Sequence, residues 1–314
     1  KHFIEKIKHL TLEDFFKANN IYLVEEKEIY DVDKLNSNRF TYLKNALDFF
    51  TLIGVKDKVT FLNNNLLCNY KNIKHRPITS FLLGSDLTLN TLPELEVYRN
   101  RPKKYRFLLL NRKPKKHRTE IFNHLKTEGY LSDTLYSHEN FVDGTKTIDP
   151  HPYSDLPKSF ITDCLVNIVT ETLFYKTEYS GNCCFITEKV DKCLSGMMPF
   201  IVVGNHSTLK QLSYLGFQSF NTVWDETYDT EEDDTRRMRL IKELITEIGT
   251  WDNDKIKSVK SELLRITKHN RCVYEKLNLA KQKLVNYRMD QNTFFDFIFY
   301  DELLSSVNLK ESLI

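Results

Sequence analysis

Thr187, Glu188 and Lys189 stand where a loop is expected to enter a helix, and their side chains suit a phosphorylated ligand. Threonine is a favourable N-cap residue, and a helix start presents free backbone N–H groups with partial positive charge. Lys189 adds a full charge with three donors, while Glu188 can accept hydrogen bonds from sugar hydroxyls. The combination suits a nucleotide diphosphate with its ribose, although a capped surface helix would show the same three residues.

A second group of charged residues follows a predicted strand at Tyr105–Leu110. The loop after this strand reads NRKPKKHR, from Asn111 to Arg118, and a helix is expected to begin at its end. Ligands of an open parallel sheet bind at the carboxyl ends of the strands, so we expect Arg118 and Lys189 to face the same edge. The remaining cations of the loop are expected to face water, namely Lys113, Lys115 and Lys116.

The elements around these residues alternate in a way that indicates a parallel α/β sheet. The apolar run at Leu165–Glu171 predicts a buried strand whose last residue, Glu171, points into a crevice or into water. Further along, the pattern predicts a helix, a strand, a helix and a strand, at Thr187–Gly196, Pro199–Val203, Ser207–Gly216 and Phe217–Phe220. Such alternation is typical of strands joined by crossover helices.

These segments resemble the donor-binding half of the α-1,3-fucosyltransferase family and of fucosyltransferase-like glycosyltransferases from viral genomes. The family's Tyr-Val-Thr-Glu-Lys segment corresponds to Phe185–Lys189, and its Pro-Val-Val-Leu-Gly strand corresponds to Pro199–Gly204. The similarity covers roughly residues 105 to 225. Phe185 replaces the family's tyrosine, which leaves only apolar or stacking contact at that position.

The resemblance implies an α/β fold of GT-B type, with two Rossmann-like domains and a crevice between them. It implies a glycosyltransferase, a hexosyl- or pentosyltransferase, that moves a sugar from a nucleotide-diphosphate sugar to an acceptor hydroxyl with inversion and without a cofactor. Arg118 matches the arginine that binds donor phosphate, and Asn111 lies one position further upstream than its counterpart. The expected donor-binding set is Asn111, Arg118, Glu171, Phe185, Thr187, Glu188, Lys189, Gly204 and Asn205.

Two further features of the expected site are the general base and the need for a metal ion. A carboxylate should deprotonate the acceptor, and Asp86, at the end of a strand expected at Ile78–Leu83, is the one candidate. Asp-x-Asp triplets at Asp31–Asp33 and Asp252–Asp254 do not follow convincing buried strands, so no metal site is predicted. Arg118 and Lys189 would supply the positive charge instead.

The chain has 314 residues, enough for two modest domains. A charged, proline-containing stretch at 92–104 suggests a boundary between an acceptor-side α/β domain, 1–98, and a nucleotide-sugar-binding domain, 99–286. Residues 287–314 should form a helical tail that packs back on the body. The other predicted elements are strands at Ile21–Val24 and Lys58–Leu62, helices at Leu12–Ala18, Phe40–Leu52, Asp254–Asn270 and Arg271–Tyr287, and a loop-rich connection at 130–160.

The composition of the chain limits its expected partners and its expected location in the cell. A net charge of +2 gives no strong field for nucleic acid, and no apolar run approaches the roughly 20 residues of a membrane span. The six cysteines lack metal-binding spacing and are expected to be reduced, which indicates a cytoplasmic protein. Abundant lysine and asparagine suit an AT-rich viral genome, hence the host cytoplasm.

Three functions stay open. The first is sugar transfer to a glycan. The second is transfer to hydroxymethylated bases of viral DNA, since the lysines near residues 103–116 could contact phosphates. The third is a non-catalytic nucleotide-sugar-binding module, which would keep Arg118, Glu188 and Lys189 but lack a base.

Overall fold

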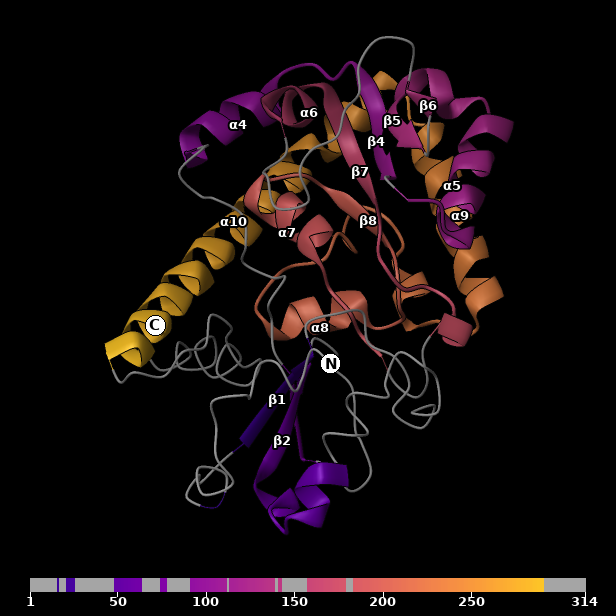
Figure 1. The fold of residues 1–314 in the computed structure, drawn as a ribbon. Helices are drawn as coiled ribbons and strands as arrows, with labels where there is room; N and C mark the ends of the chain where they lie inside the picture. The colour runs from indigo at the N-terminus through magenta and orange to yellow at the C-terminus, as the bar shows by residue number, and fades with distance from the viewer. Residues whose placement is uncertain are drawn as a thin grey trace.

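A computed structural model of the chain describes residues 16, 21–25, 48–63, 74–77, 91–111, 113–138, 141–142, 157–178 and 183–290. These residues form two β-sheets with their helices (Figure 1). Several predictions lie outside the described residues: the helix at 12–18 save residue 16, most of the helix at 40–52, the triplet at 31–33, the strand at 78–83, Asp86 and the tail beyond residue 290.

The first sheet has three parallel strands in the order β1-β2-β3. They span Ile21–Glu25, Val59–Asn63 and Lys74–Pro77. The first two confirm the strands predicted there, while β3 was not predicted. Phe50, Val55 and Val59 are buried around the helical residues 48–52 and the start of β2, so this sheet has apolar packing of its own.

The second sheet has five strands in the order β6-β5-β4-β7-β8. Their bounds are Tyr105–Asn111 for β4, Thr134–His138 for β5, Phe141–Val142 for β6, Cys164–Thr170 for β7 and Phe200–Val203 for β8. All pairs are parallel except β5 with the short edge strand β6. Every residue of β7 and β8 is buried, as expected of parallel strands covered on both faces.

The order of these strands creates a switch point beside β4. Helix α5, Lys116–Thr127, connects β4 to β5 on one side, whereas helix α7, Glu188–Ser195, connects β7 to β8 on the other. The chain thus leaves β4 and β7 in opposite directions, and in open α/β sheets ligands bind at this point, beyond the carboxyl ends of the strands. In Figure 1, α5 lies with α9, Asp234–Gly249, and α7 lies with α10, Asn253–Asp290.

The stretch at 92–104 begins with a helix that belongs to the second sheet's core. Helix α4, Leu92–Asn100, starts with a capping box between Thr91 and Glu94. Leu95 is fully buried in the same core as the strands, and the buried Arg99 donates to the carbonyl oxygens of Cys164 and Leu165, at 2.8 and 2.9 Å. The predicted boundary at residue 98 therefore falls within an element packed on the second sheet.

Two predictions of elements are wrong. Residues 217–220 form no strand, because the side chain of Asn270 bonds to both backbone polar groups of Gln218. Its Oδ1 accepts from Gln218 N at 2.7 Å, and its Nδ2 donates to Gln218 O at 2.9 Å. The two helices predicted at 254–287 are a single helix, α10, which packs on α7 and α4.

Other elements complete the second sheet. The loop-rich connection at 130–160 contains β5, β6 and the start of α6, Lys158–Asp163. Helix α8, Thr208–Tyr214, follows β8 as predicted, and the short 3-10 helix η5 spans Thr227–Thr230. Within the described portion of the chain, none of the helices combines the length and the apolar character needed to cross a membrane.

Candidate anion-binding site

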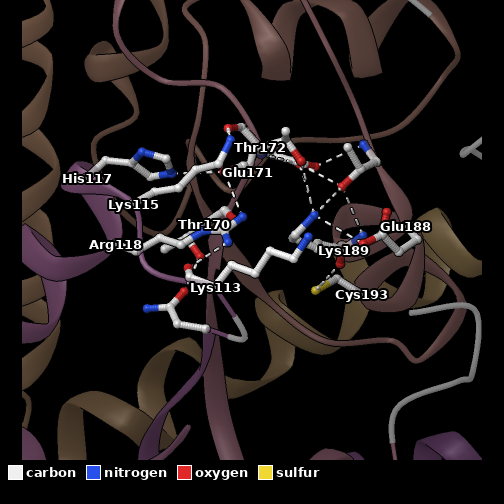
Figure 2. A network of polar contacts seen from close by, with 12 residues as sticks. Lys113, Lys115, His117, Arg118, Thr170, Glu171, Thr172, Glu188, Lys189 and Cys193 are labelled. Carbon is white, nitrogen blue, oxygen red and sulfur yellow. Dashed lines mark hydrogen bonds and ion pairs between the residues drawn. The ribbon is translucent and has the colours of Figure 1, made fainter. Parts of the chain in front are cut away.

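Arg118 lies in the first turn of α5 and reaches across to the end of β7. Its side chain is buried, with Nη1 donating to Lys113 O at 3.0 Å. Nη2 points at the carbonyl oxygens of Thr170 and Glu171, at 3.4 and 3.3 Å (Figure 2). Arg118 is therefore at the carboxyl edge of the sheet, as the sequence predicts.

Lys189 approaches the same place from α7. Thr187 caps this helix, since its Oγ accepts from Lys189 N at 3.4 Å. The ammonium of Lys189 lies 2.9 Å from Thr187 Oγ, 3.1 Å from Glu188 Oε1 and 3.4 Å from Thr172 Oγ. Arg118 and Lys189, far apart in the sequence, thus both contact the segment Thr170–Thr172 (Figure 2).

Glu171 connects the two sides through a buried carboxylate. Its Oε1 accepts from Thr187 N at 3.0 Å, and its Oε2 accepts from Thr187 Oγ at 2.6 Å and from Thr172 N at 3.1 Å. Lys189 Nζ lies 3.8 Å from Oε2. The side chain is fully buried, so it does not point into an open crevice as expected; it fixes the start of α7 and the lysine beside it.

Gly204, at the end of β8, makes this arrangement possible. A Cβ placed on Gly204 would lie 3.1 Å from Glu171 Cβ and 3.2 Å from Val202 Cγ1. Contacts this close are tighter than most real Cβ contacts, so any larger residue would push against Glu171. The structure gives Gly204 a packing role next to the expected donor site.

Lys115 and His117 also belong to this network, although neither is among the predicted site residues. The expectation that Lys115 faces water is wrong, because its Nζ donates to Thr172 O at 2.5 Å. The buried ring of His117 stacks on Phe174 and places Nε2 2.9 Å from Glu171 O. Burial lowers the pKa of His117 to about 3, so Nε2 carries the proton in the neutral ring and donates to that carbonyl.

No sequence signal marked these two residues beyond their place in the basic loop. The other two lysines of that loop, Lys113 and Lys116, are exposed, and the ammonium of Lys116 sits 4.4 Å from the centre of the Tyr175 ring.

Two asparagines at the same edge carry buried amide atoms that have no hydrogen-bond partner within the described part of the chain. Asn111, 1% exposed, accepts from Thr170 Oγ at 2.5 Å through Oδ1, but its Nδ2 has none. Asn205, 3% exposed, has none for either Oδ1 or Nδ2. Buried polar groups in native proteins are nearly always paired, so these amides indicate places where a ligand could supply the missing bonds.

The other predicted residues, Phe185 and Glu188, take no part in the network around Glu171 except through Lys189. Phe185 is 2% exposed and packs with Leu173 and Cys183, so its ring is part of a small apolar cluster. Asp225, beyond the predicted set, accepts from Thr227 N and Oγ at 2.8 and 3.0 Å and thereby caps a turn. Glu188 lies beside Lys189 with a partly exposed side chain.

The second acidic triplet also has a structural role. Asp252 accepts from Lys255 N at 2.7 Å, at the start of α10. Asp254, largely exposed, lies 3.2 Å from Lys257 Nζ. Over the described ranges, no group of three or more His, Cys, Asp or Glu residues lies close enough to hold a metal ion.

A groove of about 560 Å³ lies between α5 and α9, outside this network. It is lined by Lys116, Glu120, His124, Tyr175, Thr235, Met238, Arg239, Lys242, Glu243 and Thr246. Its wall pairs its own charges, with Lys242 Nζ 3.3 Å from Glu120 and Arg239 3.5 Å from Glu243. The convergence of unmatched amides and cations at the sheet edge makes that edge the better candidate.

Comparisons of the chain with models of protein families, with curated proteins and with solved structures found no match. The charges and amides of the site nevertheless indicate the kind of ligand that suits it. Three cations from two helix starts, Lys115, Arg118 and Lys189, surround one short backbone segment next to buried amides. Such a site is suited to an anion with several oxygen acceptors.

Proposed function

We propose that this chain is a fucosyltransferase-like glycosyltransferase that takes its sugar from a nucleotide-diphosphate sugar. In this proposal the edge beyond β4, β7 and β8 binds the donor, and a GT-B-type partner domain built from the residues before α4 presents the acceptor. The transfer inverts the anomeric carbon, needs no metal ion and delivers the sugar to a glycan hydroxyl, with Asp86 as the candidate base.

The observation that carries the proposal is the convergence of Lys115, Arg118 and Lys189 on Thr170–Thr172 at the switch point. The starts of two helices, α5 and α7, add their free N–H groups and positive ends. A diphosphate carries several negative charges over adjacent oxygens. Each hydrogen bond from a cation to such an oxygen contributes roughly 1.5–3 kcal/mol.

The residues have distinct parts in this site. Lys189, with a side chain 26% exposed, can exchange its contacts with Thr187 and Glu188 for a phosphate oxygen. Arg118 is held by three carbonyl oxygens and supplies fixed positive charge behind the ligand. In this proposal the unmatched Nδ2 of Asn111 is a further donor, and the partly exposed Glu188 beside Lys189 accepts from a ribose hydroxyl.

Nucleotide binding tests the site through Lys189→Ala. Titration calorimetry with ADP, GDP and UDP should show the Kd of the tightest ligand rising about 10- to 100-fold, from the loss of one charged hydrogen bond. Lys126→Ala is the matched control, because Lys126 is an exposed lysine in the last turn of α5. Equal binding by Lys189→Ala and the parent would mean that the diphosphate site lies elsewhere.

Turnover separates an enzyme from a binding module. The parent, incubated with nucleotide-diphosphate sugars and candidate glycans, should release nucleoside diphosphate and yield a glycoside of inverted configuration. Mass spectrometry and NMR of the product measure both. Tight nucleotide binding with no product from any donor, acceptor or hydroxymethylated DNA would favour the non-catalytic module.

A further inference from the structure

We propose that the Asn205 side chain binds a vicinal diol of the ligand, the ribose of the nucleotide or the sugar attached to it. This inference rests on the proposed function and extends it from the phosphates to the neutral part of the donor. Asn205 would then be a specificity-determining residue rather than a part of the loop alone.

The amide of Asn205 is buried, and its hydrogen-bonding capacity is unused by the described residues. Asn205 is 3% exposed, and neither Oδ1 nor Nδ2 has a hydrogen-bond partner among the residues that the structure describes. The assignment of oxygen and nitrogen in an asparagine depends on its bonds, but here both positions are unmatched, so the conclusion holds for either orientation. An unmatched buried polar group costs about 1–3 kcal/mol, which a ligand with the complementary groups would recover.

The backbone around this amide is held firmly. Asn205 O accepts from Thr208 Oγ at 2.7 Å, and Gly204 O accepts from the buried Arg237 Nε at 3.3 Å. Asp229 secures the following turn, since its carbonyl accepts from Ser207 N at 2.6 Å and its carboxylate accepts from Leu209 N at 2.9 Å. The amide is thus presented by a loop with little freedom to turn inward and satisfy itself.

The position of Asn205 places it beside the anion site. It lies two residues after β8, which pairs with β7, and the intervening Gly204 packs against Glu171. Neighbouring strands are about 4.8 Å apart, so the end of β8 is roughly one sugar unit from the end of β7. Lys115, Arg118 and Lys189 all contact the end of β7 or the two residues after it.

The chemistry of the amide selects the neutral part of the ligand. An amide presents one acceptor and one donor group side by side, and two adjacent hydroxyls can match both at once. A diphosphate offers mainly acceptors at neutral pH, so it would leave Oδ1 unmatched and repelled. A diol next to the phosphates satisfies the amide where the phosphates alone would not.

The test compares probes of increasing size on Asn205→Ala. Calorimetry would use inorganic pyrophosphate, the tightest of ADP, GDP and UDP, its 2′-deoxy form, and a nucleotide-diphosphate sugar with the same base. The variant should bind pyrophosphate as the parent does but lose about 10-fold in affinity for the probe that carries the diol. Its melting temperature should not fall, because the amide bonds to none of the described residues, whereas a merely structural asparagine would lower it when removed.

The probes also distinguish the two diols. If the ribose is bound, the nucleoside diphosphate loses affinity in the variant, while the 2′-deoxy form binds the parent and the variant equally. If the attached sugar is bound, only the nucleotide-diphosphate sugar loses affinity.

Two results would overturn the inference while leaving the proposed function standing. One is that every probe binds Asn205→Ala as tightly as the parent. The other is that pyrophosphate is weakened as much as the larger probes. A parent that binds none of the nucleotides would overturn the proposed function, and this inference with it.

Discussion

At the scale of the residue, Glu171 decides the geometry of the site without facing a ligand. Its two oxygens receive three hydrogen bonds, from Thr187 N, Thr187 Oγ and Thr172 N. Oε2 also lies 3.8 Å from the ammonium of Lys189. A carboxylate is suited to this place because it only accepts, and every group facing it donates.

Glu171→Gln tests this role with almost no change in volume. An amide would turn its NH₂ group toward N–H donors, leaving part of the network unmatched, so the free energy of unfolding should fall by about 1–3 kcal/mol. Urea denaturation measures the change. Glu247→Gln, an exposed glutamate of α9, should leave stability within about 0.5 kcal/mol of the parent. A variant at position 171 as stable as that control would contradict the role.

At the scale of the element, α9 joins the loops that bound the site. Arg237 of this helix is 1% exposed and stacks 4.5 Å from the centre of the Phe174 ring. Its guanidinium donates to the carbonyl oxygens of Phe174, Gly204 and Glu231, at 2.7, 3.3 and 2.9 Å. One side chain therefore ties together the segments that follow β7 and β8.

Arg237→Met, which keeps much of the side-chain length, should lower the free energy of unfolding by about 3 kcal/mol or more. The physical reason is that three carbonyl oxygens lose their donor and Asp234 loses its partner, at 2.7 Å. Arg236→Met is the matched neighbour: its side chain is 64% exposed and pairs with Glu231 at the surface. That variant should change stability by less than about 1 kcal/mol. Similar losses for the two arginines in urea denaturation would refute the argument.

How well the sequence predicted an element depended on whether local residues decide it. The β4 strand, the cap at Thr187 and the helix end at Gly196 were predicted, because periodicity and capping are local properties. The strand expected at 217–220 failed because its backbone partner is Asn270, far along the chain. Lys115 was misjudged for the same reason, since its partner, Thr172, follows a different strand.

At the scale of the whole molecule, the sheet order carries the main consequence for function. The alternation of elements predicted a parallel sheet, but only the pairing of β4 with both β5 and β7 shows where the connections diverge. That divergence brings the predicted cations, Arg118 and Lys189, to one edge. Sequence periodicity does not encode strand order, so the unmatched amides of Asn111 and Asn205 could be recognised only in the folded chain.

The stability of the whole chain should depend on pH through the buried His117 and the partly buried Glu226, which have opposite effects. Burial lowers the pKa of His117 to about 3, against roughly 6.5 in an unfolded chain. Its contribution to stability is complete above pH 6.5 and is lost as the pH falls toward 3. Burial raises the pKa of Glu226 to about 7, so its contribution is complete below about pH 4.5 and is lost as the pH rises through 7. Between pH 5 and 7 the two effects oppose each other, and these two groups should leave stability nearly flat.

Glu226→Gln separates the two effects. An uncharged side chain has no carboxylate to bury, so the variant should exceed the parent in free energy of unfolding by about 3 kcal/mol at pH 8, and the difference should shrink toward zero near pH 4.5. The glutamine can still accept from Trp224 Nε1, which lies 3.2 Å from Glu226 Oε1, so this bond is retained. Without the opposing carboxyl, stability should fall steadily from pH 7 to pH 5 as the unfolded chain binds protons at His117. Urea denaturation of the parent and the variant at pH 4.5, 6 and 8 measures the free energy of unfolding at each pH. A gain of equal size at pH 4.5 and pH 8 would show that the substitution acts through packing and that the carboxyl at position 226 does not titrate as its burial requires.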